Sequence, residues 1–157
     1  MKDSSRKKMS DFYDNLVNNH GLDIKSLHGK DANYTKSKQE TKFSIISKYI
    51  KDKDSVLDVG CGLADLNFFL LERNWIGQYN GIDISPKMVE MCNNTLGKKS
   101  VSCVDIVEED YKKNHDIVVS ISALQHRPPF EEGDEYIKKI VTKMYDISNE
   151  FTIFDVF

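Results

Sequence analysis

Apolar residues along the chain gather in five short runs, and segments with helical spacing separate most of them. Short apolar runs rich in valine and isoleucine are typical of strands that are buried on both faces. We expect strands at residues 55–60, 79–84, 100–104, 116–122 and 151–157.

The segments between these runs repeat apolar residues every three or four positions, which places them on one helical face. We expect helices at residues 38–51, 63–73, 86–96 and 131–147, and a shorter one near 10–19. Pro86 suits a first helical position, which needs no backbone N–H, and Ser85 suits the N-cap before it. The predicted buried faces include Tyr49 in the helix at 38–51 and Tyr145 in the helix at 131–147.

The alternation of strands and helices determines the expected fold. It predicts an α/β protein whose parallel strands are joined by crossover helices on both faces of the sheet. We expect a three-layer, doubly wound, mostly parallel sheet in the order 3-2-1-4-5, with a ligand between strands 1 and 4, where the order reverses. The more polar residues 1–37 are predicted to form an N-terminal helical and loop cap on a core at 38–157.

The composition fits one globular domain of 157 residues, with 39% hydrophobic and 30% charged residues. The net charge of −3 argues against a dedicated nucleic-acid binder, which usually carries a basic surface. No apolar run approaches the roughly 20 residues that span a bilayer, and the charged N-terminus lacks the hydrophobic segment of a secretory signal. Three cysteines without metal-site spacing predict neither a disulfide framework nor a metal site, and a reducing cytoplasm suits them.

A glycine turn follows the first predicted strand, in the sequence Asp58-Val59-Gly60-Cys61-Gly62-Leu63-Ala64-Asp65. Gly60 and Gly62 allow positive φ angles and a close approach of ligand to backbone, and the next helix offers free N–H groups. A dinucleotide site would have a glycine where Asp65 stands, and a carboxylate there would repel a pyrophosphate. The acid at Asp58 suits a positively charged group instead.

A second acid, Asp83, closes the second predicted strand 23 positions after Gly60. That separation is close to the one from which an acid reaches a ribose, and a carboxylate can accept from both ribose hydroxyls. Capping of the next helix is the alternative role, but Ser85 already fills it. Ile84 and Met88 would then offer apolar surface to an adenine, although plain core packing explains Met88 nearly as well.

Four segments together resemble motifs I to IV of class I S-adenosylmethionine-dependent methyltransferases, in the order and spacing of that family. They are VLDVGCGLADL (56–66), YNGIDISPKMVEMC (79–92), VSCVDI (101–106) and DIVVSISALQH (116–126). The resemblance covers residues 38–157. It implies a Rossmann-like methyltransferase core that binds S-adenosyl-L-methionine and releases S-adenosyl-L-homocysteine, with Asp58, Gly60, Gly62 and Asp83 among the binding residues.

The resemblance also implies roles for residues after strands 3 and 4. The family's acid after strand 3 approaches the adenine amino group, and this position corresponds to Asp105, with Ile106 beside the ring. The end of strand 4 lines the methionine moiety, which corresponds to Ser120 and Ile121.

The chain departs from the family pattern in two places. Ala64 replaces the usual third glycine of motif I, and we expect its methyl group to be tolerated. The family's sheet has seven strands in the order 3-2-1-4-5-7-6, whereas this chain ends at the fifth. Residues 151–157 would form an apolar, unpaired edge. We therefore expect either that the chain is a fragment or that a partner, such as a second copy in a homodimer, covers this edge.

A few residues beside the cofactor are candidates for the chemistry of transfer. His126, just past the fourth strand, is a candidate general base, although a loop histidine that packs or caps is the plainer interpretation. The segment before strand 1 often closes over the cofactor in the family, and Ser37 and Gln39 lie there.

The leading functional hypothesis is a methyltransferase that acts on a small-molecule acceptor. The Asn/Asp-Pro-Pro-Tyr signature of amino-methylating DNA enzymes is absent, which weakly favours a small substrate. A truncated or non-catalytic S-adenosylmethionine-binding module that associates through its strand-5 edge is the alternative. A nicotinamide dehydrogenase is a third hypothesis, which Asp65 disfavours.

Overall fold

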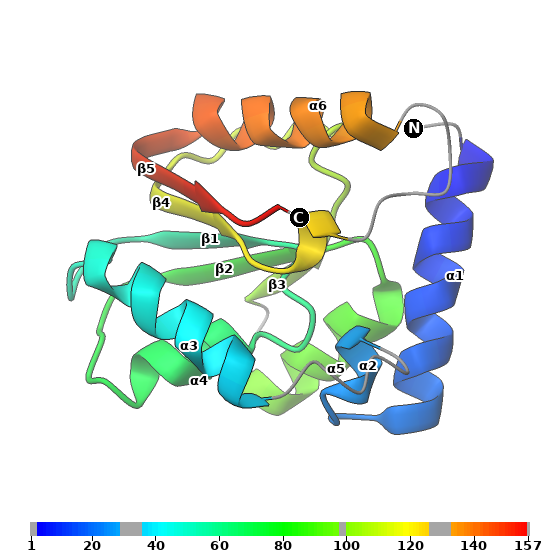
Figure 1. Cartoon of the computed structure of the whole chain (residues 1–157), viewed down its shortest axis with the longest axis horizontal. Helices are drawn as coiled ribbons and strands as arrows, with labels where there is room; N and C mark the ends of the chain where they lie inside the picture. Colours follow the sequence, from blue (N-terminus) through cyan, green and yellow to red (C-terminus); the bar gives the residue numbers. More distant parts are fainter. Residues whose placement is uncertain (1–2, 29–35, 98–99, 126–132, 157) are drawn as a thin grey trace.

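Five parallel strands form a single sheet in the order β3-β2-β1-β4-β5 (Figure 1). The computed structural model describes residues 3–28, 36–97, 100–125 and 133–156. The strands are β1 (Val56–Val59), β2 (Tyr79–Asp83), β3 (Val101–Cys103), β4 (His115–Ser120) and β5 (Ser148–Phe154). The predicted α/β fold and its strand order 3-2-1-4-5 are therefore confirmed.

The helices lie close to their predicted positions. They are α1 (Asp3–His20), α2 (Lys25–His28), α3 (Lys36–Ile46), α4 (Asp65–Leu71), α5 (Pro86–Leu96) and α6 (Gly133–Asp146), with 3₁₀ turns η1 (Ser47–Tyr49) and η2 (Ala123–Gln125). The largest differences are α1, which begins seven residues before the predicted start, and α3, which gives way to η1 after Ile46. Pro86 and Ser85 hold the predicted first-turn and N-cap positions, and the Ser85 hydroxyl accepts the Met88 N–H.

The core has two halves because consecutive strand residues point to opposite faces of the sheet. Helices α3, α4 and α5 cover one face, and α6 covers the other (Figure 1). Val56 of β1 belongs to the first half, with Phe43 and Phe69, whereas its neighbour Leu57 belongs to the second, with Met144. This double coverage explains why β1 is buried along its whole length.

Two tyrosines predicted to be buried are exposed: Tyr49 is 52% exposed and Tyr145 is 74% exposed. Tyr49 lies in η1, where the tighter winding of a 3₁₀ turn shifts the side chain off the helical face. There its ring packs edge-on against Phe151, with ring centroids 6.1 Å apart. Tyr145 lies in the last turn of α6, directly after the fully buried Met144, so it points away from the core that Met144 enters.

Helix α1 stands across the carboxyl ends of the strands, with α2 beside it (Figure 1). Val17 of α1 packs there against Leu63 and Met88. The predicted border between cap and core falls inside α3, at residue 37, so the division into a cap and a core stays a prediction. None of the helices described is both long enough and apolar enough to cross a lipid bilayer.

The buried His115 at the start of β4 makes stability depend on pH. Burial, together with the nearby Lys113, lowers the pKa of His115 to about 4, while Asp116 opposes the shift. The ring accepts or donates one hydrogen bond with the Tyr111 hydroxyl, at 2.9 Å. Between pH 6.5 and 4 the unfolded chain binds a proton that the native chain does not bind. The free energy of unfolding therefore falls with acid over this range.

We expect His115→Gln to remove this contribution, which amounts to at most about 3 kcal/mol between pH 6.5 and 4. The measurement is urea unfolding of both proteins at several pH values, and the quantity compared is the difference between their free energies of unfolding at each pH. The matched control is His20→Gln, because His20 is exposed at the end of α1. Equal pH dependence in wild type and His115→Gln would contradict this account.

Candidate functional site

A pocket opens at the carboxyl ends of the strands, beneath α1 and α2. All ten residues predicted to bind the cofactor line it: Asp58, Gly60, Gly62, Asp83, Ile84, Met88, Asp105, Ile106, Ser120 and Ile121. The candidate base His126 lies outside the described residues. The sheet brings the ten together because the ends of β1, β2, β3 and β4 meet at one edge.

The glycine turn after β1 needs the backbone freedom of its glycines. Gly60 has a φ of +73° and Gly62 a φ of +52°, both in the left-handed region. A Cβ atom on Gly60 would overlap the Cβ of Ala123 in η2, and one on Gly62 would overlap the side chain of Leu27 in α2. The turn is therefore held between two short elements that also line the pocket.

Ala64, at the usual position of the third glycine, also has a positive φ, of 58°. An alanine in the left-handed region costs about 1–2 kcal/mol. The methyl group is fully buried, so the sequence expectation that it fits is consistent with the structure. The left-handed backbone conformation is therefore one reason why a glycine is usual at this position.

Asp83 connects the glycine turn to the start of α5. Its Oδ2 accepts the Gly62 N–H at 3.0 Å, and its Oδ1 accepts the Ser85 N–H at 2.9 Å. Burial raises the pKa of Asp83, while the hydrogen bonds from these two amides oppose the shift. The Ser85 hydroxyl caps α5, as predicted, so the carboxylate of Asp83 is not the helix cap.

Asp58 is a second buried acid beside the turn. Its Oδ2 accepts the Tyr79 hydroxyl at 2.9 Å. Burial, with the charges of Asp83 and Asp65, raises the pKa of Asp58 to about 7, although the hydrogen bond from Tyr79 opposes the shift. Burial likewise raises the pKa of Asp65, against a hydrogen bond from Gln39. Three acids thus give this end of the pocket a negative character that a cation would relieve.

Asp105 lies at the other end of the pocket, after β3, and is only 1% exposed. Its Oδ1 accepts the Tyr136 hydroxyl and the Val107 N–H, both at 3.0 Å. Its Oδ2 is buried without a hydrogen bond in the part of the chain that the structure describes, and lies 3.6 Å from Nε of Arg6. A buried acceptor without a hydrogen bond is costly, so a ligand N–H would stabilise it.

The end of β4 forms the remaining wall. The Ser120 hydroxyl donates to the Val59 carbonyl at 2.9 Å, which links β4 to β1. Ile121 is half-buried and lines the pocket beside it. Within the described residues, no group of histidine, cysteine and acidic side chains is arranged to hold a metal ion.

The N-terminal helices supply pocket residues that sequence reasoning missed, namely Met9 and Tyr13 of α1 and Leu27 of α2. Burial and the nearby Asp83 raise the pKa of Tyr13. The apolar pattern of α1 is weak, and which of its faces meets the pocket depends on how the helix docks. Gln39 lines the pocket as its position suggested, whereas Ser37 is exposed and does not.

Polar contacts fix α1 over the pocket. The Arg6 guanidinium lies 2.9 Å from a Glu109 carboxylate oxygen. About two turns further along the helix, Asp14 accepts the Ser85 hydroxyl at 2.5 Å and the Lys87 N–H at 3.2 Å. Helix α1 is therefore bonded to Glu109, which accepts the Asp105 N–H, and to Ser85, whose N–H donates to Asp83.

Solved structures of methyltransferases share this fold. A sugar N-methyltransferase from Streptoalloteichus is similar with a TM-score of 0.61 and 18% identity, over 92% of this chain and 53% of that chain. The magnesium protoporphyrin IX methyltransferase from Synechocystis, solved with bound S-adenosylhomocysteine, is similar with a TM-score of 0.63 and 16% identity, over 92% and 68%. A [4+2]-cyclase, SpnF, is also similar, with a TM-score of 0.60 and 20% identity over 87% of this chain and 55% of that one.

Curated relatives and a family model identify the family. A malonyl-[acyl-carrier protein] O-methyltransferase from Acetivibrio thermocellus is 30% identical over 96 residues, which are 60% of this chain and 34% of that protein. One from Anoxybacillus flavithermus is 24% identical over 84 residues, or 52% and 32%. The chain thus spans about a third of the length of these two relatives. The model of the methyltransferase domain matches residues 56–145, more than half of the chain. The chain therefore belongs to the class I S-adenosylmethionine-dependent methyltransferase family.

Proposed function

We propose that this chain binds S-adenosyl-L-methionine and transfers its methyl group to a small-molecule acceptor, leaving S-adenosyl-L-homocysteine. The observation that carries the proposal is that three acids line one pocket, with Asp58 and Asp83 beside the glycine turn and Asp105 at the other end. Family membership supports the same function. The fold alone would not distinguish a methyltransferase, because a cyclase has the same fold.

The adenosine half of the cofactor suits the β2 and β3 side of the pocket. The Asp83 carboxylate would accept from the ribose hydroxyls, since each oxygen already bonded to an amide keeps a second lone pair. Ile84, Met88 and Ile106 line the pocket and would offer apolar surface to the adenine. The Asp105 Oδ2, which lacks a hydrogen bond among the described residues, would accept the adenine amino group.

The methionine half suits the glycine turn and the end of β4. Asp58 would face the ammonium group, Gly60 and Gly62 would let the backbone approach it, and Ser120 and Ile121 would line the methionine chain. A diphosphate at the same place would meet the charges of Asp58 and Asp65, which disfavours a nicotinamide dinucleotide.

The protein's part in transfer would be to align and desolvate the reacting groups. The bound cofactor supplies an electrophilic methyl group on a sulfonium, so the acceptor needs mainly correct placement. A base is needed only for an acceptor that arrives protonated, and His126 stays the candidate for that role.

The acceptor is proposed to be a small molecule. A net charge of −3 does not suit a nucleic-acid substrate. The relatives do not agree on an acceptor, because the two curated ones are named O-methyltransferases and the structural neighbour from Streptoalloteichus a sugar N-methyltransferase. We also propose a cytoplasmic location, since Cys61, Cys92 and Cys103 are free thiols.

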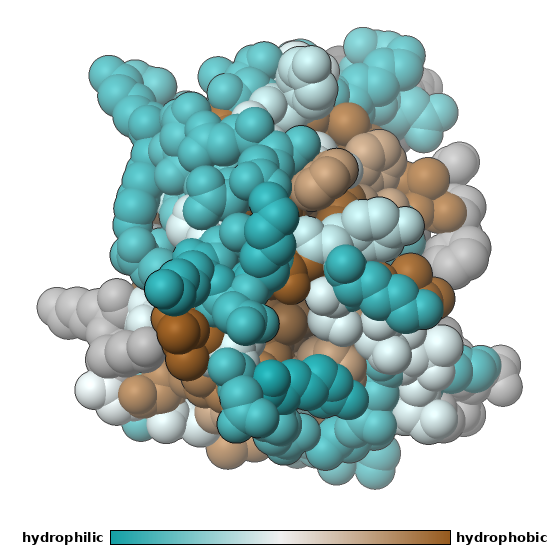
Figure 2. All heavy atoms as spheres, turned by 90° about the vertical axis from the view of Figure 1, so that its left-hand side faces the viewer, coloured by the Kyte–Doolittle hydropathy of each residue, from teal (hydrophilic) through white to brown (hydrophobic). Residues whose placement is uncertain are grey.

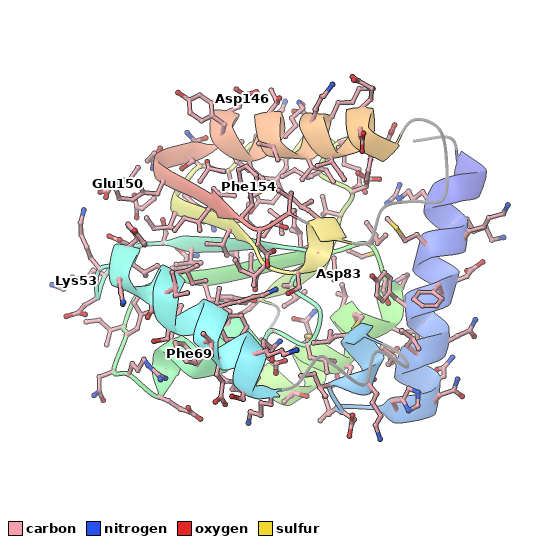
Figure 3. The ribbon with its side chains drawn as sticks, in the orientation of Figure 1. Lys53, Phe69, Asp83, Asp146, Glu150 and Phe154 are labelled. Carbon is pink, nitrogen blue, oxygen red and sulfur yellow. The ribbon has the colours of Figure 1, made fainter. Side chains whose placement is uncertain are left out.

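Asp83→Asn tests the binding site. An amide at this position loses the charge and one acceptor oxygen, so we expect the dissociation constant for S-adenosylmethionine to rise at least about tenfold. Isothermal titration calorimetry measures it, with Asp146→Asn as the control, because Asp146 lies at the end of α6, far from Asp83 (Figure 3). Wild-type protein that binds NAD and not S-adenosylmethionine would overturn the proposal. Binding without transfer of labelled methyl groups to any metabolite pool would favour the non-catalytic module.

Binding should also depend on pH through Asp58. Because the pKa of Asp58 is raised to about 7, a cation that needs its carboxylate must compete with a proton below pH 7. The α-amino group of the cofactor stays charged below about pH 7.5. We expect the affinity to fall about tenfold between pH 7.5 and 6, and the slope to disappear in Asp58→Asn. A wild-type affinity that does not change over this range would contradict a role for Asp58 in holding the ammonium.

One observation favours the alternative of a module that associates through β5. Phe151 and Phe154 are 45% and 40% exposed on β5, the outer edge strand of the described sheet, and Val156, just after this strand, is 52% exposed. Figure 2, which views the molecule from the end where the strands begin, shows hydrophobic residues on the side that carries β5. Long apolar edge strands attract partners, so a second copy of the chain is the proposed occupant.

Phe154→Lys tests that association, because a charge on the edge strand disfavours pairing. We expect light scattering to show a dimer for wild-type protein and a monomer for the variant, with unchanged binding of S-adenosylmethionine. Lys138→Met on the exposed face of α6 is a control that should leave the dimer intact. A monomeric wild-type chain at high concentration would refute the homodimer.

A further inference from the structure

A cluster of three side chains joins α3 to the ends of β4 and β5. The Lys42 ammonium lies 2.6 Å from Oδ2 of Asp155 and donates to Oγ of Ser122 at 3.0 Å. The other oxygen of Asp155, Oδ1, accepts the backbone N–H of Ser122 at 2.6 Å. Three segments far apart in sequence are thus fixed to one another at the pocket end of the sheet.

The cluster is more buried than the ion pair between Lys51 and Glu150 of β5. The side chains of Lys42 and Asp155 are 21% and 23% exposed, whereas those of Lys51 and Glu150 are 67% and 37% exposed. Figure 3 shows Glu150 and Phe154, which precedes Asp155, at opposite ends of β5. Exposed ion pairs contribute little to stability, so the second pair is a natural control for the first.

The backbone at Ser122 is the part of the chain that the cluster holds. Ser122 has a φ of +66°, in the left-handed region that is unfavourable for a residue with a Cβ. Its N–H is fixed by Asp155 and its hydroxyl by Lys42. A serine in this conformation persists only when its surroundings compensate the strain.

The conformation of Ser122 determines where the next turn lies. Ala123 follows it and begins η2, and its Cβ occupies the space that a Cβ on Gly60 would need. Ser120, Ile121, Ser122 and Ala123 all line the pocket, on the side where the methionine chain is proposed to bind. A change at Ser122 would therefore move η2 relative to the glycine turn.

We propose that Lys42 and Asp155 are positioning residues for the side of the pocket where the methionine chain would bind. They act by holding Ser122 in its left-handed conformation. For the part that concerns ligand binding, this inference rests on the proposed function. It assigns a role in the site to α3 and to the residue after β5, neither of which contributes one of the ten predicted cofactor residues.

The test compares Asp155→Ala with Glu150→Ala, and Lys42→Met with Lys51→Met. We expect amide hydrogen exchange at residues 120–125 to become at least about tenfold faster in the two cluster variants, because each loses a charge-assisted hydrogen bond that opposes local opening. The dissociation constant for S-adenosylmethionine should rise about tenfold in the same variants. Both quantities should stay at wild-type values in Glu150→Ala and Lys51→Met.

Asp155→Asn provides a rescue, because its amide oxygen can still accept the Ser122 N–H. We expect it to restore most of the protection from exchange that Asp155→Ala loses. Unchanged exchange at residues 120–125 in Asp155→Ala would overturn the inference, as would a rise in exchange spread evenly over the whole chain. If wild-type protein does not bind S-adenosylmethionine, the proposed function fails, while the exchange comparison still decides the role of the cluster.

Discussion

The site depends above all on one buried carboxylate at the end of β2. Asp83 accepts the amide of Gly62 with one oxygen and that of Ser85 with the other, so it joins the glycine turn to the start of α5. A buried carboxylate is stable only when it is hydrogen-bonded. The same two bonds leave its remaining lone pairs for a ligand with neighbouring hydroxyls. On either side of it, Asp58 would then bind an amine and Asp105 an adenine.

Much of this site could be predicted from sequence because its signals are local. Gly60 and Gly62 indicate the turn, and Ser85 and Pro86 indicate the start of α5. The short apolar runs indicate parallel strands and their order in the sheet. Parallel strands end at one edge, so residues that follow them are brought together without knowledge of side-chain packing. That is why all ten residues chosen from sequence line one pocket. Their contacts with the cofactor stay predictions.

The rest depends on how elements dock, which the sequence does not display. Tyr13 meets the pocket only because α1 lies across the strand ends, and the cluster of Lys42 and Asp155 forms between residues 113 positions apart. The prediction that Tyr49 is buried is wrong because α3 gives way to a 3₁₀ turn that contains Tyr49. Asp155 directly follows the exposed Phe154 on the edge strand, and it bonds to Ser122, which lines the pocket. The edge of the sheet and the pocket are therefore close to each other along the chain.

Because a cyclase shares this fold, the decisive evidence is where a ligand binds. The most direct measurement is a crystal structure of the chain with S-adenosylhomocysteine. The account predicts ribose hydroxyls on the Asp83 carboxylate, the adenine amino group on Oδ2 of Asp105 and the amine beside Asp58. A ligand whose sugar lies away from Asp83, or a nicotinamide dinucleotide bound in its place from a mixture of the two, would contradict it.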